Sequence, residues 1–382
     1  MINLSESKNP PTEVAIITDT HFGARNDSRV FLDNQRRFCD EMFFPMLAER
    51  RIHHLLHLGD YFDRRKFINF STLWESNQFF LEKLAEYDIH MYVVAGNHDT
   101  AYKNTNRVNS LDLSIASHPN VTVFSNDTQD IQLSNDLIVK MVPWINSENQ
   151  SRIMRDIAFN ENNASVLAGH FEIAGFTMHK GAAVSDHGMD TDVFTSYDKV
   201  LSGHYHHKST SNGIMYLGAA FEFNWSDYDD PRGFHIMQTN SESSIEFIRN
   251  PYCVFHHIDY HHESSSPSQN FSLIENGFVK VLQHDNHDPY HFDRFLENVY
   301  SYAPHNVQVV DMRNDPDDPI NGGMTDEEIQ DRVKDTAQLI DECVDSIDDS
   351  EIDSDAERDQ LRKLMIRLYQ QSQQEEETDP DD

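Results

Sequence analysis

The chain has 382 residues and a formal net charge of -35 at pH 7, with 65 acidic residues against 30 lysines and arginines. This length excludes a single very small domain and allows one large α/β core with one or two further modules. No apolar run is long enough to span a bilayer, so we expect a globular protein without membrane association. The strong negative charge argues against a broad basic surface for DNA, because phosphate neutralisation needs clustered Lys and Arg.

The beginning of the chain and its cysteines favour a reducing compartment. The first residues, MINLSESKNPPTEV, lack the basic start, apolar middle and cleavage site of a secretory signal. Cys39, Cys253 and Cys343 form neither a disulfide framework nor a CxxC metal pair. We expect a cytoplasmic protein, in the host cytoplasm if it is viral. Many acidic residues lie beyond Asp311, so they need not surround an active site; a partner could supply positive charge, and a high-salt host is another source of the acidity.

Apolar runs that end abruptly in polar residues mark the first part of the chain, as buried strands do. These runs are residues 14–18, 55–58, 91–95, 166–168 and 200–202. Two segments of helical character, Phe31 to Arg50 and Ser71 to Tyr87, separate the first three runs and give a βαβαβ alternation. We predict an α/β domain over residues 1–250, with its functional residues just beyond the carboxyl ends of the strands.

The pattern changes near Asn250. Residues 256–270 are typical of a linker or an exposed loop. A strand over 278–282, a helix over 291–300 and a strand over 307–310 then follow. These segments predict a small α+β module within residues 251–322.

The last part of the chain has helical periodicity. Apolar residues recur at helical spacing over 329–347 and again over 361–368, which predicts a pair of amphipathic helices within residues 323–370. Two short helices have little core of their own, so they must dock, either on this protein's own core or on a partner. Residues 371–382 are expected to be a disordered acidic tail.

An ordered set of Asp, His and Asn residues follows the predicted strands. The set is Asp19-x-His21, Gly59-Asp60-x-x-Asp63, Gly96-Asn97-His98-Asp99, Gly169-His170 and Gly203-His204-x-His206. Each fragment alone occurs often by chance, but chance does not readily place all of them in order at strand ends. Their oxygen and nitrogen donors suit divalent manganese, iron or zinc. Asp60 is the natural candidate to bridge two ions, a pair that can bind a phosphate and activate a water.

This order of motifs resembles the calcineurin-like metallophosphoesterase superfamily over residues 12 to 250. The resemblance implies a two-sheet α/β sandwich flanked by helices. It further implies that one metal is held by Asp19, His21, Asp60 and His206, and the other by Asp60, Asn97, His170 and His204. His98 would contact the scissile phosphate and help to protonate the leaving oxygen; the alternative is a supporting histidine that orients Asn97 or Asp99. Asp63 and Asp99 are expected to support the site rather than to bind metal.

Further motifs resemble the nuclease branch of this superfamily, specifically the SbcD-type subunit in its tailed-bacteriophage form. They are Gly169-His170-Phe171-Glu172, His187-Gly188-Met189-Asp190, Tyr197-Asp198-Lys199-Val200, Tyr216-Leu217-Gly218 and Asp230-Pro231-Arg232-Gly233-Phe234. The resemblance implies Mn2+-dependent cleavage of DNA, exonucleolytic on double-stranded ends and endonucleolytic on single strands, in recombination or repair. It also implies a cap role for residues 251–322, an SMC-like coiled-coil ATPase partner bound by the C-terminal helices, and a homodimer formed through helices of the catalytic domain.

Some features depart from that branch. Asp63 stands where many cellular relatives have a histidine, and the loop Tyr61 to Lys66 is similar to that of a protein phosphatase. A small-substrate phosphodiesterase or protein phosphatase of the same fold is therefore the alternative, and a catalytically silent scaffold is a further one. Arg64, Arg65 and Lys66 either meet DNA phosphates or belong to a solvated loop. The remaining histidines are expected to pack or to be solvated; they are His53, His54, His57, His207, His256, His257, His261 and His262.

Overall fold

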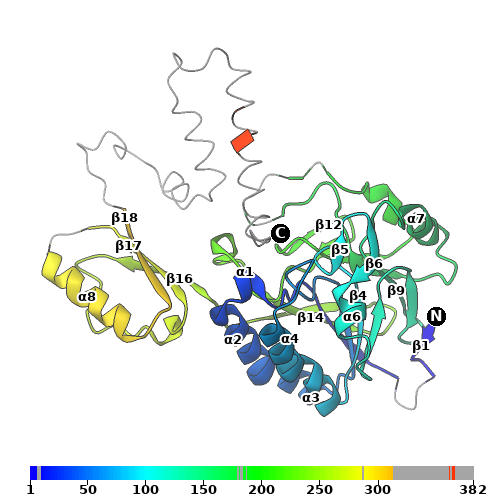
Figure 1. Cartoon of the computed structure of the whole chain (residues 1–382), viewed down its shortest axis with the longest axis horizontal. Coiled ribbons are helices and arrows are strands. Elements are labelled where there is room, and N and C mark those ends of the chain that lie inside the picture. Colours follow the sequence, from blue (N-terminus) through cyan, green and yellow to red (C-terminus); the bar gives the residue numbers. More distant parts are fainter. Residues whose placement is uncertain are drawn as a thin grey trace. The chain divides into compact units, whose positions relative to one another are not determined.

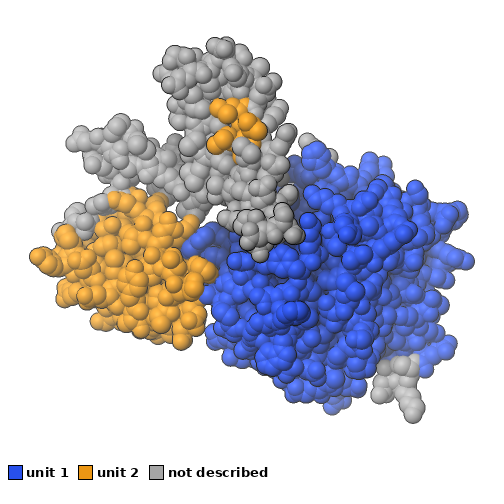
Figure 2. Space-filling model, viewed as in Figure 1, with its two compact units in different colours: residues 1–255 blue, residues 256–382 orange. Residues whose placement is uncertain are grey.

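The computed structural model describes residues 1–6, 10–178, 180, 184–185, 187–285, 288–312, 361 and 364–365. It divides the chain into two compact units, residues 1–255 and residues 256–382, which Figure 2 colours separately. The expected helical pair over 323–370 lies outside the described residues except at 361 and 364–365, and the expected tail over 371–382 lies outside them entirely. No described helix is both long and apolar enough to cross a membrane.

The first sheet of unit 1 has six strands in the order β15-β14-β2-β3-β4-β7. The strands are β2 (Glu13–Ile17), β3 (His54–His57), β4 (His90–Val94), β7 (Val121–Phe124), β14 (Gly233–Gln238) and β15 (Ile245–Arg249). Strands β2, β3, β4 and β7 are parallel to one another, whereas β14 runs antiparallel to β2. The central strands are buried almost throughout, which explains their continuous apolar runs.

The second sheet of unit 1 has seven strands in the order β1-β8-β9-β10-β11-β13-β12. The strands are β1 (Ile2–Asn3), β8 (Gln129–Gln132), β9 (Ile138–Val142), β10 (Val166–His170), β11 (Lys199–Gly203), β12 (Ser209–Ser211) and β13 (Ile214–Tyr216). Val14, Ile16 and Leu56 of the first sheet share one buried core with Val139 and Ala168 of the second. This shared core confirms the predicted two-sheet α/β sandwich.

Helices flank the sandwich, as Figure 1 shows for α2, α3 and α4 in blue and α7 in green. One helical stretch comprises α2 (Arg29–Phe38), η1 (Cys39–Phe43) and α3 (Phe44–Arg50), and another comprises α4 (Phe70–Ser76), η2 (Asn77–Leu81) and α5 (Glu82–Glu86). Both match the helices expected from the sequence. Phe43 links the first stretch to the second and to the sheet, because its ring packs against Phe80 of η2 and Phe234 of β14. The helices therefore rest on the outer face of the first sheet through aromatic contacts.

Shorter elements complete unit 1. They are α1 (Ala24–Asp27), the hairpin β5 (Thr100–Tyr102) and β6 (Thr105–Asn109), α6 (Ser110–Ser114), α7 (Gln150–Phe159), η3 (Thr191–Phe194) and η4 (Trp225–Asp227). Helix α7 buries Ile153 and Ile157 in a second apolar cluster with Leu167, Phe171 and Val200. This cluster lies on the outer face of the second sheet and supports the loops around its carboxyl end.

Unit 2 contains a three-stranded sheet in the order β16-β17-β18. The elements are β16 (Phe255–Tyr260), η5 (Ser272–Ile274), β17 (Phe278–Gln283), α8 (Pro289–Ser301) and β18 (Asn306–Asp311). The strands and helix expected over 278–310 are confirmed. The prediction that residues 256–270 form a linker or loop is wrong at its start, because residues 256–260 belong to β16. Buried Ile258 and Tyr260 mark this strand, whose pattern was obscured by the polar residues between them.

Candidate metal centre

The predicted site residues all lie at or just beyond the carboxyl ends of parallel strands. Asp19 and His21 follow β2, Asp60 follows β3, and Asn97 and His98 follow β4. In the second sheet, His170 ends β10 opposite Gly203 of β11, and His204 and His206 come next along the chain. Because the two sheets pack face to face, these strand ends bring all eight residues together in one cluster. The fold thus brings together residues that lie as far apart in sequence as Asp19 and His206.

One donor group is formed by Asp19, His21 and His206, whose ligand atoms lie within 4.8 Å of one another. Nε2 of His21 is 3.1 Å from Nε2 of His206 and 3.8 Å from Oδ1 of Asp19. The same nitrogen is 3.7 Å from Oδ2 of Asp60. Two ring nitrogens and two carboxylates therefore converge on one point, as the ligands of a divalent ion do.

A second donor group is formed by Asp60, His170 and His204, again within 4.8 Å. Nε2 of His170 is 3.3 Å from Oδ2 of Asp60 and 2.9 Å from Oδ1 of Asn97. Nδ1 of His204 is also 2.9 Å from Oδ1 of Asn97. The Asn97 oxygen thus completes a set of two oxygens and two nitrogens.

The hydrogen bonds of His170 test whether this set fits a cation. Nδ1 of His170 lies 2.8 Å from the carbonyl oxygen of Leu58, which can only accept, so this nitrogen carries the proton. In a neutral ring Nε2 then points a lone pair at the Asp60 and Asn97 oxygens. Burial alone would lower the pKa of His170, but the Asp60 carboxylate outweighs it and raises this pKa to about 9. The carboxylate beside His170 thus favours a positive charge at this position, which a metal ion would provide.

In the first donor group, the surroundings of His21 likewise favour a positive charge. Burial opposes the charged form of this ring, but the contact with Asp63 and the charge of Asp60 raise its pKa to about 9. Oδ1 of Asp63 lies 3.3 Å from Nδ1 of His21, on the side of the ring away from the donor group. Asp63 is therefore placed to orient His21, as carboxylates do for metal-binding histidines.

Asp60 lies between the two donor groups. Its Oδ1 accepts the backbone N–H of His98 at 2.8 Å, while its Oδ2 faces both His21 and His170. One carboxylate is thus shared by two sets of ligands. Such an arrangement suits a pair of cations that need a common anion between them.

The backbone at the site is held in unusual conformations. Asp19, His21, Asp60 and His204 have φ angles of 52°, 44°, 53° and 86°, in the left-handed region. Residues in this region cost on the order of 1–3 kcal/mol each and persist where the surroundings fix them. A cluster of such residues at one point is the pattern of a functional site.

The loops that follow β3 and β4 approach each other closely at Asp60 and Gly96. A Cβ added to Gly96 would lie 2.2 Å from Oδ1 of Asp60 and 2.3 Å from its backbone nitrogen. The buried Asp99 carboxylate holds the same loops together by accepting the backbone N–H groups of Tyr61, Phe62 and Gly96. Asp99 therefore organises the loops that follow β3 and β4, in agreement with the supporting role expected of it.

His98 is anchored through its backbone and one ring nitrogen. Nδ1 lies 2.5 Å from the carbonyl oxygen of Asp63, so this nitrogen donates. The ring meets that of His21 edge to face, with 4.9 Å between centroids. Nε2 is left as the atom available to a substrate. Among the described residues, the His98 ring makes no hydrogen bond to Asn97 or Asp99 that would favour the alternative role of orienting them.

Two aromatic residues at the site belong to no motif in the sequence. The Trp144 ring lies 5.9 Å from the His170 ring and 5.2 Å from the His204 ring, between centroids. The Phe223 ring lies 5.2 Å from that of His21. The one signal in the sequence for Trp144 is its place just after the apolar run of β9, at the same end of the sheet.

Three other polar residues near the motifs already have hydrogen-bond or ion-pair partners within unit 1. His57 is buried, with Nε2 3.0 Å from the hydroxyl of Thr20, and burial lowers its pKa to about 3. His207 pairs with Asp230 at 2.9 Å. Arg64 donates to Asn26 and lies 3.4 Å from Asp27, so it is already engaged within unit 1. These contacts favour packing over ligand binding at each position.

Comparison with known proteins places this geometry in a family. The calcineurin-like phosphoesterase model matches residues 12–208. Exonuclease subunit 1 of Enterobacteria phage T4 is 34% identical over 51% of this chain and 55% of its own length. The SbcD component of nuclease SbcCD from Staphylococcus saprophyticus is 22% identical over 60% of this chain and 66% of its own length. The matched region thus spans between about half and two thirds of these curated relatives.

Solved structures also match. A dimetal phosphatase from Danio rerio aligns with a TM-score of 0.35 and 11% identity over 60% of this chain and 93% of that structure. The family model covers more than half of the chain, and every candidate metal ligand from Asp19 to His206 lies within the residues it matches. The chain belongs to the calcineurin-like phosphoesterase family.

Proposed function

We propose that this chain is a two-metal DNA nuclease, the catalytic subunit of an SbcCD-type complex with an SMC-like ATPase. The observation that carries the proposal is the sharing of Asp60 by two donor groups, each of which adds two histidines and one further side-chain oxygen. The names of the two curated relatives, an exonuclease subunit and a nuclease subunit, favour a nucleic acid over small phosphate esters.

The proposed ligands divide between two ions. Asp19, His21 and His206 would hold one, Asn97, His170 and His204 the other, and Asp60 would bridge them. Bound at these positions, two divalent ions supply a Lewis acid for the phosphate, an activated water and stabilisation of the charge that develops in displacement. The donors are oxygens and imidazole nitrogens without a thiolate, which suits manganese, iron or zinc. Of these we propose Mn2+, the ion that the resemblance to SbcD-type nucleases implies.

His98 is proposed to move a proton in this reaction. Its Nδ1–H is fixed on the carbonyl oxygen of Asp63, and its backbone N–H is fixed on Asp60. The ring therefore cannot turn freely, and Nε2 is held beside the donor groups. From this position it would donate a proton to the leaving oxygen of the cleaved phosphodiester.

The acidity of the chain makes a partner part of the proposal. With a formal charge of -35, the protein needs positive charge from elsewhere to hold DNA. We propose that the ATPase supplies it and that residues 323–370 bind the ATPase. A homodimer is proposed through the α4–α5 stretch, because Phe70 and Trp74 of α4 are 87% and 65% exposed.

Cleavage of a labelled linear DNA duplex tests the proposal. The protein is incubated with manganese, with manganese and an excess of chelator, and with manganese plus the ATPase partner and ATP. Degradation that requires manganese supports a nuclease. Absence of cleavage under every condition, beside good turnover of a small aryl phosphodiester, would overturn the DNA assignment and favour a small-substrate phosphodiesterase.

A further inference from the structure

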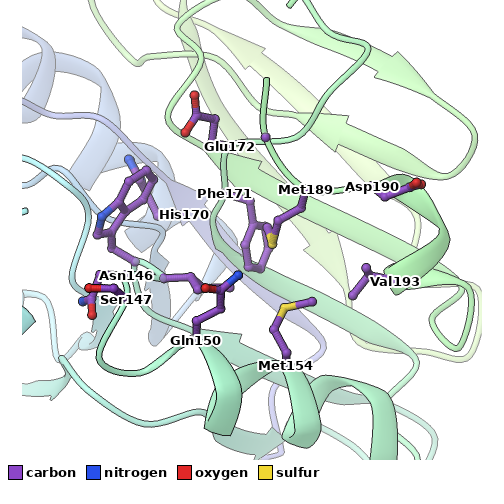
Figure 3. A pocket seen from close by; sticks show the side chains of 13 residues that line it. Asn146, Ser147, Gln150, Met154, His170, Phe171, Glu172, Met189, Asp190 and Val193 are labelled. Carbon is purple, nitrogen blue, oxygen red and sulfur yellow. The ribbon is translucent and has the colours of Figure 1, made fainter. Parts of the chain in front are cut away.

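A cavity of about 470 Å³ opens beside the metal centre and is not used by the chemistry described above. It lies between α7, the loop that follows β9 and the segment that leads into η3. Figure 3 shows Gln150 and Met154 rising from α7 on one side, with Met189 and Val193 on the other. Its volume falls within the range of about 300–1,000 Å³ that is usual for small-molecule sites.

The cavity shares a wall with the second donor group. His170 and Trp144 both line it, and the Trp144 ring packs against the rings of His170 and His204. The Trp144 backbone is fixed on both sides, since its N–H donates to Ala95 at 2.7 Å and its carbonyl accepts from Asn106 at 2.8 Å. The half-buried indole therefore extends from a fixed backbone next to the place where a scissile phosphate would bind.

The interior of the cavity is apolar. Phe171 is buried, and Met154, Met189 and Val193 are partly buried residues that pack against the same core cluster. Methionine side chains adapt to flat ligands of different outline. Such a lining suits a planar, uncharged group.

The border of the cavity is polar and carries two acidic side chains, which disfavour a phosphate there. Glu172 and Asp190 line it, and among the described residues neither forms an ion pair with a lysine or arginine that would cancel its charge. The Asn146 carboxamide is already engaged, because it donates to Asn106 at 2.7 Å and accepts from Glu148. Gln150, exposed at the start of α7, has no hydrogen bond from its carboxamide to another described residue, so it can bond to the edge of a ligand.

We propose that this cavity binds the nucleobase of a nucleotide next to the scissile phosphate. The proposal rests on the nuclease function. It also explains how the scissile phosphate would be brought to the metal centre. In a duplex the sugar–phosphate backbone follows the stacked bases, and drawing one base out of the stack rotates the backbone of that nucleotide away from its regular path. The aromatic and methionine walls hold the displaced base by stacking, which tolerates every base, while Gln150 and the carboxylates favour bases that carry an amino group.

Calorimetric binding of two small ligands tests the proposal without depending on cleavage. The manganese-loaded protein is titrated with deoxyadenosine 5′-monophosphate and with deoxyribose 5-phosphate, which share the phosphate and sugar. The nucleotide should bind about tenfold more tightly or better, as expected when one base stacks on an aromatic side chain. In Gln150→Trp, where an indole occupies the cavity, the two affinities should become equal.

Arg155→Trp is the matched control, because Arg155 is exposed on the same helix and does not line the cavity. This variant should keep the wild-type ratio of affinities. Equal affinities in the wild-type protein, or binding of neither ligand, would overturn the proposal. A failure of the nuclease function would be seen separately, as tight nucleotide binding without cleavage of DNA.

Discussion

The backbone N–H of His98 donates to Oδ1 of Asp60 at 2.8 Å. The loop after β4 thereby orients the carboxylate that follows β3, so the candidate acid and the candidate bridge form one rigid unit. This coupling explains why the oxygen left over, Oδ2, faces both donor groups. It also means that the two residues must be tested separately.

Replacement of His98 by leucine removes the ring but keeps the backbone N–H that holds Asp60. We expect manganese binding to persist and DNA hydrolysis to fall by a factor on the order of 10² or more, as loss of a positioned acid should cause. The loss should be smaller for a p-nitrophenyl phosphodiester, because this leaving group needs less protonation. Rates on the two substrates provide the measurement.

The control is His53→Leu, which removes a half-exposed histidine just before β3, at the end of that strand opposite to Asp60. It should leave both rates unchanged. Equal losses on both substrates for His98→Leu, together with loss of metal, would show that His98 supports the ligands instead of donating a proton.

A methyl group at Gly96 should disturb the bridge. The added Cβ of Gly96→Ala would overlap Oδ1 and the backbone nitrogen of Asp60, and overpacking of this kind typically costs about 1–3 kcal/mol. We expect lower stability and weaker manganese binding, measured by thermal unfolding and metal titration. Gly213→Ala is the comparison, because its φ of +80° also disfavours alanine but its added Cβ would meet only Asp198, at 3.5 Å. It should lose stability and keep its metal; unchanged metal affinity in Gly96→Ala would contradict the described loop contact.

His235 should make unit 1 sensitive to acid. Burial, with a further contribution from Lys208, lowers its pKa from 6.5 to about 3, and neither ring nitrogen has a hydrogen-bond partner in the described part of the chain. A folded-state pKa below the unfolded value gives stability that is present above pH 6.5 and is lost as the pH falls toward 3. Between pH 7 and pH 5 this loss amounts to about 2 kcal/mol.

The variant His235→Phe should therefore lose less stability than wild type over the same pH range. Urea unfolding at the two pH values measures the difference. Substitution of the exposed His187 by phenylalanine controls for removal of a surface histidine. An identical pH response in wild type and His235→Phe would contradict the buried, neutral state assigned to this ring.

Deletion of residues 324–382 tests the proposed partner segment. We expect the shortened chain to keep its metal content and its hydrolysis of an aryl phosphodiester, because every candidate ligand lies before residue 207. Co-purification with the coiled-coil ATPase should be lost. Aggregation or loss of metal would instead favour docking of these helices on the protein's own core.

The sequence predicted which side chains would lie together, because the candidate ligands follow strand ends. The apolar runs before Asp19, Asp60 and Asn97 are parallel strands of one sheet, so their neighbours in sequence had to meet in space. Trp144 was missed because a single tryptophan after a strand has no distinctive spacing. The cavity beside it could not be foreseen, since it depends on how α7 packs against a distant loop that contains Met189.

In unit 2, one strand could not be predicted from the sequence. β17 has four apolar residues interrupted only by Lys280 before it ends at Gln283, and it was found, whereas β16 contains His256, His257 and Asp259 and resembled a loop. Its alternation becomes visible only once Phe255, Ile258 and Tyr260 are known to be buried. Polar residues on a half-buried strand therefore concealed its start from periodicity alone.

The manganese content of four proteins tests the shared-carboxylate centre most directly. These are wild type, Asp60→Asn, His206→Ala and His204→Ala, each dialysed against manganese and then measured by elemental analysis. We predict two ions in wild type, one in each histidine variant and weakened binding of both in Asp60→Asn. Retention of two tightly bound ions by Asp60→Asn, or a single ion in wild type, would contradict the centre proposed for this protein.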